Sequence, residues 1–263
     1  MDEIKSVTEE RLYEIAIEKD FSRELIAKDY VLTIILFLLK NVEGIYFKGG
    51  TALHKVFLHH ARISEDIDFT LTRNIKEVDI EIARILEDSG RFSTITHDKN
   101  VDDFLRVVVH YTLFDKISGS VFIDLNARGT LMLKPETHQV HHFYSPFIPA
   151  FSIKTLAQEE MIAEKVAATI GRNKPRDHFD VYKIIHAHLP LNMDIVKKKC
   201  AASGDSFSII KMFNKAKMLK NRWDQDMLPL LAEEISFPTI MRSLAAHFKL
   251  KEEKEHIKKN RKK

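Results

Sequence analysis

Hydrophobic and polar positions along the chain change their period near residue 45 and again near residue 150. The first forty residues show helical spacing, and their most apolar stretch is 24–39. Short β-prone runs and two helical segments follow. The expected strands are 45–47, 67–71, 92–96, 105–113 and 121–125, and the expected helices are 51–58 and 78–87. This alternation predicts a small sheet with helices packed on it.

Beyond Pro149 the strand signals stop. Segments 154–170, 176–187 and 193–201 have helical spacing, as do several later ones. The change predicts two domains, a sheet-containing core with N-terminal helices at 1–150 and a helical domain at 151–263. The predicted fold class is therefore α+β, a small mixed sheet with packed helices followed by a helical C-terminal region.

Composition narrows the class of protein. Hydrophobic residues make up 44% of the 263, a share typical of globular domains. The single cysteine, Cys200, excludes an intramolecular disulfide and fits a reducing compartment. No apolar run reaches the roughly 18 residues that span a bilayer, and the first ten residues are too acidic and polar for a signal peptide. We expect a cytoplasmic protein without membrane contact.

Charge is unevenly distributed although the net value is only +3. Residues 249–263 contain eight Lys or Arg and three Asp or Glu, so this tail carries +5 and the remainder −2. A basic tail can bind the phosphates of RNA or DNA. Taken alone, such a tail is more typical of a solvated terminus.

The most informative polar pattern is Asp66-Ile67-Asp68-Phe69. Side chains alternate between the two faces of a strand, so Asp66 and Asp68 point the same way while Ile67 and Phe69 face the core. Two adjacent carboxylates repel each other unless a cation lies between them. Magnesium suits this pair because it binds one or two carboxylates together with substrate phosphates.

A glycine turn precedes this pair by about fifteen residues. Gly49 and Gly50 allow the backbone to approach a phosphate closely, the following helix start offers free N–H donors, and Thr51 adds a hydroxyl. Alone, Gly-Gly-Thr is only a tight turn, and Asp-x-Asp is common on solvated strands. In this order the two motifs together predict a phosphate cradle beside a metal pair.

A third carboxylate is expected if two metal ions assist an in-line displacement. Asp124 is the best candidate because it is a lone acid within an apolar strand, where an unpaired buried charge is costly. The alternative is that Asp124 is simply exposed. Asp115 is the reserve candidate, although it lies in an expected turn.

The motifs resemble the AbiEii/AbiGii toxin family of DNA polymerase β-like nucleotidyltransferases. The resemblance covers about residues 40 to 185. Its motifs are Lys48-Gly49-Gly50-Thr51-Ala52-Leu53, Arg62-x-Ser64-x-Asp66-x-Asp68 and Lys174-Pro175-Arg176-Asp177-x-x-Asp180. The resemblance implies a polymerase β-like sheet, a nucleoside triphosphate substrate, two Mg²⁺ ions and, often, a cognate antitoxin. Some relatives modify the acceptor end of transfer RNA.

The resemblance also implies roles for individual residues. Asp66, Asp68 and Asp124 would bind the metals, and Lys165 would be catalytic through the triphosphate. The implied nucleotide-binding residues are Lys48, Gly49, Gly50, Thr51, Arg62, Ser64, Arg176, Asp177 and Asp180. From the residues alone, Lys165 is equally a helix-surface lysine paired with Glu160 or Glu164.

Asp177 and Asp180 share one face of the expected helix, and Arg176 can reach Asp180 at i, i+4. Acidic side chains near a helix start also oppose the helix dipole favourably. These residues therefore have a structural interpretation beside the implied one, in which they orient Lys165 or bind the base.

The predicted function is transfer of a nucleoside monophosphate from a triphosphate to an acceptor hydroxyl, by the toxin of a toxin–antitoxin pair acting on transfer RNA. One alternative replaces RNA by a small molecule or a protein as acceptor. Another is a nucleotide-binding subunit of a toxin–antitoxin complex without turnover. A metal-dependent nuclease fits the motifs least, because a nuclease reaction would leave the glycine turn without a function.

Overall fold

The computed structural model describes residues 4–260. Residues 1–3 and 261–263 lie outside this range, so it excludes the first residues of the amino-terminal segment and the last three of the basic tail. The chain forms two compact units, Met1–Ala157 and Gln158–Lys263. Each unit is described separately.

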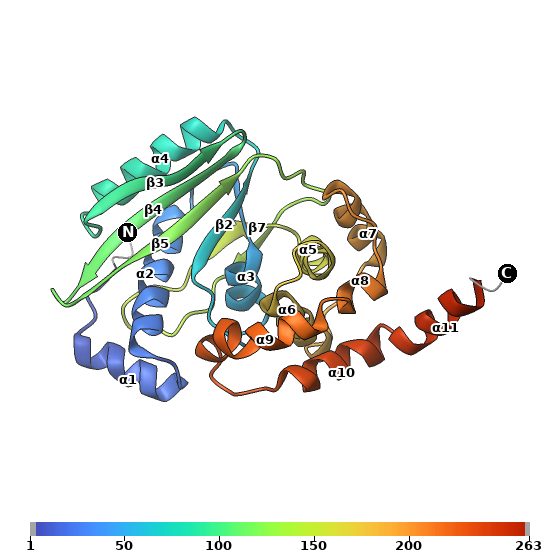
Figure 1. Cartoon of the computed structure of the whole chain (residues 1–263). Helices are drawn as coiled ribbons and strands as arrows, with labels where there is room; N and C mark the ends of the chain where they lie inside the picture. Colours follow the sequence, from blue (N-terminus) through green and yellow to red (C-terminus); the bar gives the residue numbers. More distant parts are fainter. Residues whose placement is uncertain (1–3, 261–263) are drawn as a thin grey trace. The chain divides into compact units, whose positions relative to one another are not determined.

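Unit 1 is built on a seven-stranded mixed sheet with the order β3-β4-β5-β2-β1-β7-β6 (Figure 1). The pairs β2–β5 and β1–β7 are parallel, and the others are antiparallel. The strands are β1 Ile45–Lys48, β2 Asp66–Leu71, β3 Thr94–Val101, β4 Phe104–Leu113, β5 Ile117–Asn126, β6 Glu136–Gln139 and β7 Ser152–Thr155. The predicted α+β class with a small mixed sheet is confirmed.

One face of the central strands forms the core of unit 1. Ile67 and Phe69 of β2 are fully buried, and so are Ile123 and Leu125 of β5. Both strands alternate as predicted, because the residues between these four are only partly buried. The alternation assigns the apolar side chains to the core and leaves the acidic ones on the other face.

The three longest helices of unit 1 are α1 (Glu9–Lys19), α2 (Arg23–Leu39) and α4 (Ile75–Asp88), and the short α3 (Gly49–Ala52) and a π-helix (Leu53–Phe57) follow β1. α2 contacts α1, α4 and β5, and most of its residues are buried, which explains its uninterrupted apolar sequence. α4 contacts α2 and β4 through side chains spaced four residues apart. Among residues 4–260, no helix combines the length and the apolar character that crossing a bilayer requires.

The prediction that strands end before residue 150 is wrong. β7 follows Pro149 and pairs in parallel with β1, where Phe47 is opposite Thr155. The helix expected from residue 154 begins only at Gln158. β6 was also not predicted. Both strands are four residues long and largely polar, so neither carries the apolar alternation by which longer strands are recognised.

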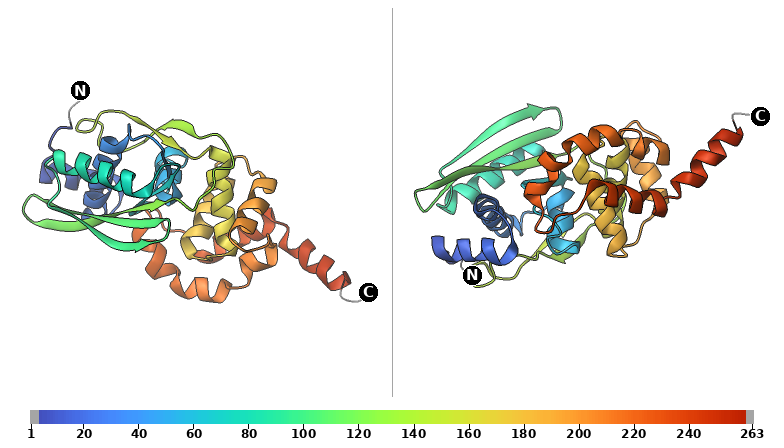
Figure 2. Two further views of the ribbon diagram at one scale, coloured as in Figure 1. Left: turned by 90° about the horizontal axis from the view of Figure 1, so that it is seen from above. Right: turned by 60° about the horizontal axis from the view of Figure 1, so that its bottom comes forward.

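Unit 2 is entirely helical in its described part. Its helices are α5 Gln158–Ile170, α6 Pro175–His186, α7 Met193–Ala202, α8 Ile209–Phe213, α9 Ala216–Met227, η2 Leu228–Leu230, α10 Phe237–His247 and α11 Leu250–Asn260. Trp223 of α9 is buried against Phe179 and Phe237. α11 buries no residue, and its far end extends away from the other helices of the unit (Figure 2).

Candidate active site

A row of charged residues crosses four neighbouring strands of unit 1. Asp68 of β2 pairs in register with Lys48 of β1 and with Asp124 of β5. Asp124 in turn pairs with Arg106 of β4. Residues directly opposite each other on paired strands point to the same face. The row Lys48–Asp68–Asp124–Arg106 therefore lies on the face opposite the core, with Asp66 two residues before Asp68 on that same face.

The glycine turn lies against the Asp68 carboxylate. Gly49 has φ +79°, in the left-handed region that favours glycine. A Cβ atom at Gly49 would lie 2.1 Å from Asp68 Oδ2, far inside van der Waals contact. Two separate constraints thus require glycine here, the backbone conformation and the space that Asp68 occupies.

Gly49→Ala should separate these constraints when compared with Gly90→Ala. Gly90 also has positive φ, but nothing lies within 4 Å of its Cβ position. We expect Gly90→Ala to cost about 1 kcal/mol of unfolding free energy, from backbone strain alone, with activity unchanged. Gly49→Ala should cost more and reduce transfer about a hundredfold, because Asp68 must move. Urea unfolding measures the stability of both variants. Equal transfer activities for the two variants would contradict this account of the turn.

Thr51 joins the turn to β2. Its buried hydroxyl donates a hydrogen bond to the Asp66 carbonyl oxygen. Arg62, in the loop before β2, is only 1% exposed and donates from Nη1 to the Ile63 carbonyl oxygen at 3.0 Å. Ser64 is partly exposed in the same loop. The Thr51 contact therefore positions the carboxylate strand relative to the turn, and the Arg62 contact stabilises the loop before that strand.

A buried polar network anchors the segment after the turn. α3 (Gly49–Ala52) continues into a π-helix (Leu53–Phe57) that carries Lys55. Lys55 Nζ lies 2.8 Å from Asp29 Oδ1 on α2 and donates to Thr33 Oγ1 at 3.0 Å. Tyr144 donates to Asp29 Oδ2 at 3.0 Å. Burial lowers the pKa of Lys55 and raises that of Tyr144. The network therefore fixes the turn to the core of unit 1.

Asp124 is held by Arg106, a residue that sequence reasoning missed. Arg106 Nε and Nη2 each donate to one Asp124 oxygen at 2.7 Å, and their side chains are 20% and 14% exposed. The hydrogen bonds with Asp124 raise the pKa of Arg106. The register of the β4–β5 hairpin could have identified Arg106, since a turn centred near residue 115 places residue 106 opposite residue 124. Asp115 lies exposed in that turn.

Replacing Arg106 by Gln should lower stability without metal and increase the response to magnesium. The variant loses two charge-assisted hydrogen bonds and leaves Asp124 beside Asp68, so we expect a loss of about 2 kcal/mol and a melting temperature lower by about 4–8 °C. Magnesium should raise the melting temperature of the variant by more than it raises that of the unmodified protein, because the ion replaces the missing cation. Melting curves with and without magnesium check the expectation, and identical magnesium shifts would contradict it.

The oxygen-only donor set of Asp66 and Asp68 fits a hard divalent cation such as Mg²⁺. Both side chains project from one face of β2, and Gly49 leaves Asp68 room. Within residues 4–260, no three His, Cys, Asp or Glu side chains are already gathered as a metal-binding group. Both oxygens of Asp124 contact Arg106. Each Asp124 oxygen keeps a second lone pair beside these bonds, so Asp124 can contribute a third carboxylate next to Asp68.

Lys165, Arg176, Asp177 and Asp180 belong to unit 2. Lys165 Nζ on α5 forms an ion pair with Asp180 Oδ2 on α6 at 2.9 Å, with side chains 7% and 0% exposed. Lys165 is therefore not the surface lysine of the alternative interpretation. Glu160 and Glu164 instead contact Lys199 of α7 at 2.6 and 2.9 Å.

Asp177 has a local structural role. Its carboxylate accepts from the Arg172 guanidinium, at 3.1 Å from Nε, and from the Lys174 backbone N–H at 3.3 Å, where it caps α6. Burial, followed by the charges of Arg176 and Arg172, lowers the pKa of Lys174. The start of α6 is therefore rich in cations, of which one is neutralised by Asp177.

The sequence model of the family described as "Nucleotidyl transferase AbiEii toxin, Type IV TA system" matches residues 37–246. No curated protein matches the chain. JHP933 from Helicobacter pylori has a similar structure, with TM-score 0.62 and 18% identity, covering 92% of this chain and 99% of that one. MenT4, a nucleotidyltransferase toxin from Mycobacterium tuberculosis H37Rv, has TM-score 0.58 and 20% identity over 84% and 73% of the two chains.

At these identities the two structures establish the fold alone. The family match covers most of the chain and contains every motif from the glycine turn to Asp180. The chain therefore belongs to the AbiEii nucleotidyl transferase toxin family, and it is a nucleotidyltransferase.

Proposed function

We propose that the chain transfers a nucleoside monophosphate from a nucleoside triphosphate to a hydroxyl of transfer RNA, in a magnesium-dependent reaction. The observation that carries the proposal is the placement of Asp68 and Asp124 in register on neighbouring strands, with Asp66 on the same face and the glycine turn against Asp68. An arrangement of carboxylates beside a phosphate cradle serves phosphoryl transfer.

In the proposed reaction, Asp66, Asp68 and Asp124 would hold the metal, and Arg106 orients the Asp124 carboxylate. Bound magnesium supplies charge neutralisation for the triphosphate. One Asp124 carboxylate oxygen takes the proton of the acceptor hydroxyl. The hydroxyl oxygen then forms a bond to the α-phosphorus, the bond from that phosphorus to the bridging oxygen breaks, and pyrophosphate leaves.

The remaining predicted residues bind and position the nucleotide in this proposal. The backbone N–H groups after Gly49 and Gly50 face the phosphates, and Lys48 adds a positive charge at the end of β1. Lys165 neutralises the leaving pyrophosphate, and Asp180 holds its ammonium group in place. Thr51 and Arg62 act indirectly, through the backbone contacts described above. Ser64, Arg176 and Asp177 stay predictions as nucleotide contacts.

Transfer RNA is the acceptor we propose because the second unit is strongly basic. Unit 2 contains 22 Lys and Arg against 14 Asp and Glu, a net charge of +8, whereas unit 1 carries −5. A polyanionic acceptor is attracted to such a surface, and a small neutral acceptor is not. A transfer RNA acceptor places the reaction in the cytoplasm. The family description implies a toxin–antitoxin system, so we include a cognate antitoxin as the protein partner.

The proposal is tested by incubating the protein with each labelled nucleoside triphosphate, magnesium and total transfer RNA, beside Asp68→Asn. Label on RNA with the unmodified protein alone identifies the nucleotide and the acceptor class. Pyrophosphate release without labelled RNA would indicate that the acceptor is a small molecule or a protein. Nucleotide binding without release of pyrophosphate would favour the non-catalytic alternative, and RNA cleavage would favour a nuclease.

A further inference from the structure

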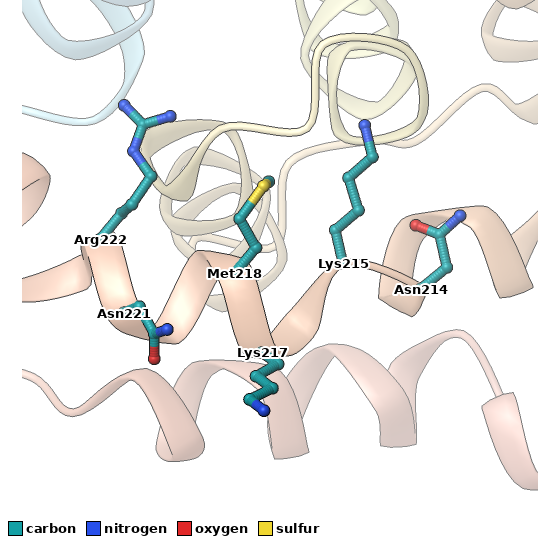
Figure 3. Close-up of a pocket in the computed structure, with 6 residues that line it drawn as sticks. All are labelled: Asn214, Lys215, Lys217, Met218, Asn221 and Arg222. Carbon is teal, nitrogen blue, oxygen red and sulfur yellow. The ribbon is translucent and has the colours of Figure 1, made fainter.

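A pocket on the surface of unit 2 gathers positive charge. Its volume is about 490 Å³, and it lies along α9. Its lining residues are Asn214, Lys215, Lys217, Met218, Asn221 and Arg222. In Figure 3 the side chains of Met218 and Arg222 on α9, and of Lys215 immediately before it, extend toward the same side. The pocket therefore presents cations and amide groups around one apolar side chain.

The sequence around this pocket is exclusively basic among its charged residues. Between Asp205 and Asp224 lie Lys211, Lys215, Lys217, Lys220 and Arg222, and no Asp or Glu. A solvated helix face usually mixes both signs of charge, because opposite charges spaced three or four residues apart stabilise the helix. Apart from the i, i+4 pair of Arg222 with Asp226, the charges of this segment do not form such pairs with acidic residues inside it, so their pattern suits an anionic ligand.

The positive charge continues beyond the pocket within unit 2. Arg222 is close enough to Lys174 to contribute to the lowered pKa of that lysine, after burial and the charges of Arg176 and Arg172. Two carboxylates neutralise part of this charge, since Asp177 pairs with Arg172 and Asp226 pairs with Arg222. Lys174, Arg176, Lys215 and Lys217 add further cations, so the region from α9 to the start of α6 keeps an excess of positive charge.

We propose that this pocket binds phosphodiester groups of the RNA acceptor, an inference that rests on the proposed function. All six lining residues are exposed. A site for a small ligand usually encloses most of the ligand surface, so an open pocket fits a polymer held at several points. Lys215 and Arg222 are seven residues apart along α9, a helical rise of about 10 Å, so each reaches a different phosphate of one strand.

An acidic protein segment is the other polyanion that such a pocket could attract. Protein interfaces, however, are anchored by clusters of aromatic and aliphatic side chains. This pocket has only Met218 in that role. Protein–nucleic acid interfaces are polar and positively charged, and amide side chains such as Asn214 and Asn221 can bind ribose and base edges. The composition of the lining favours RNA.

The test compares Lys215→Gln/Arg222→Gln with Lys198→Gln/Arg242→Gln in the full-length protein. The second pair removes the same charge from exposed positions of unit 2 outside the pocket lining. Binding of labelled total transfer RNA is measured by fluorescence anisotropy between 50 and 200 mM salt. This comparison separates the effect of where the charge is removed from the effect of how much charge is removed.

We expect the pocket variant to bind transfer RNA about tenfold more weakly, with the slope of log K against log salt reduced by about 1.5–2. The control pair should change the dissociation constant less than twofold. With saturating RNA, the pocket variant should keep the unmodified kcat and show a raised KM for RNA only. Equal losses in both variants, no loss in either, or no RNA binding by the unmodified protein would overturn the proposal.

Two further readouts distinguish this inference from the proposed function. Asp68→Asn should bind transfer RNA as the unmodified protein does, so RNA binding can be judged even if no transfer is found. A raised KM for the nucleoside triphosphate in the pocket variant would assign the pocket to the triphosphate and overturn the RNA assignment. Binding of an acidic peptide in competition with RNA at equal affinity would also overturn it.

Discussion

Asp68→Asn should reduce nucleotidyl transfer about a thousandfold or more and leave the fold intact. Asp68 lies between Lys48 and Asp124 in the row across the sheet and against Gly49. Asparagine keeps the shape of the side chain and removes its charge, so the metal loses a ligand oxygen and the triphosphate loses several kcal/mol of charge neutralisation. Initial rates of label incorporation measure the loss.

The fold should tolerate this change because Asp68 is adjacent to two other carboxylates on its own face. Removing one negative charge relieves their repulsion and offsets the lost attraction to Lys48. Thermal unfolding should therefore show a melting temperature close to that of the unmodified protein. Asp115→Asn is the matched control, since Asp115 is exposed in the β4–β5 turn with φ +55°, a conformation that asparagine also adopts. Asp68→Asn with more than a tenth of the original activity would exclude Asp68 as an essential ligand.

Asp180→Ala should destabilise unit 2 by about 3–5 kcal/mol and lower the melting temperature by about 10 °C. The substitution removes the carboxylate 2.9 Å from Lys165 Nζ and leaves that ammonium group buried without this counter-charge. By comparison, Lys197→Ala removes an exposed pair with Asp194 and should change stability by less than about 0.5 kcal/mol. Urea unfolding followed by circular dichroism measures both variants.

A double variant separates the stability of this ion pair from its chemistry. Lys165→Met with Asp180→Leu replaces both buried charges by apolar groups of similar size, so most of the stability lost in Asp180→Ala should return. Transfer should stay lost, because the ammonium group assigned to the triphosphate is absent. Recovery of transfer along with stability would show that the pair serves the fold alone.

The sequence predicted the central strands of unit 1 because each has one apolar face and one polar face. Ile67 and Phe69 are buried and Asp66 and Asp68 are not, as the period of two requires. The same alternation made Asp124 a candidate, since a lone acid interrupts the apolar positions of β5. The strand face on which each of these acids lies was therefore predictable from local pattern alone.

Other features depend on pairings that local pattern does not contain. β6 and β7 are short, largely polar strands at the sheet edge beyond β1. Their own residues lack the apolar alternation that predicts a strand. Arg106 became visible as a partner of Asp124 only through the register of β4 with β5. Local pattern placed only Arg176 within reach of Asp180, and it was the resemblance that implied the orientation of Lys165, because the Lys165–Asp180 ion pair joins two helices.

The parallel pairing of β2 with β5 affects the order in which the chain can become active. Asp68 and Asp124 are neighbours in space, but α4, β3 and β4 lie between them in sequence. Contacts between such distant segments form late in folding, because the loop between them must close first. During synthesis, β1 can pair with its parallel partner β7 only after the chain has reached Thr155, where β7 ends. A growing chain therefore assembles its carboxylate row only after β5, which ends at Asn126, has been synthesised, and shorter nascent chains carry no complete row.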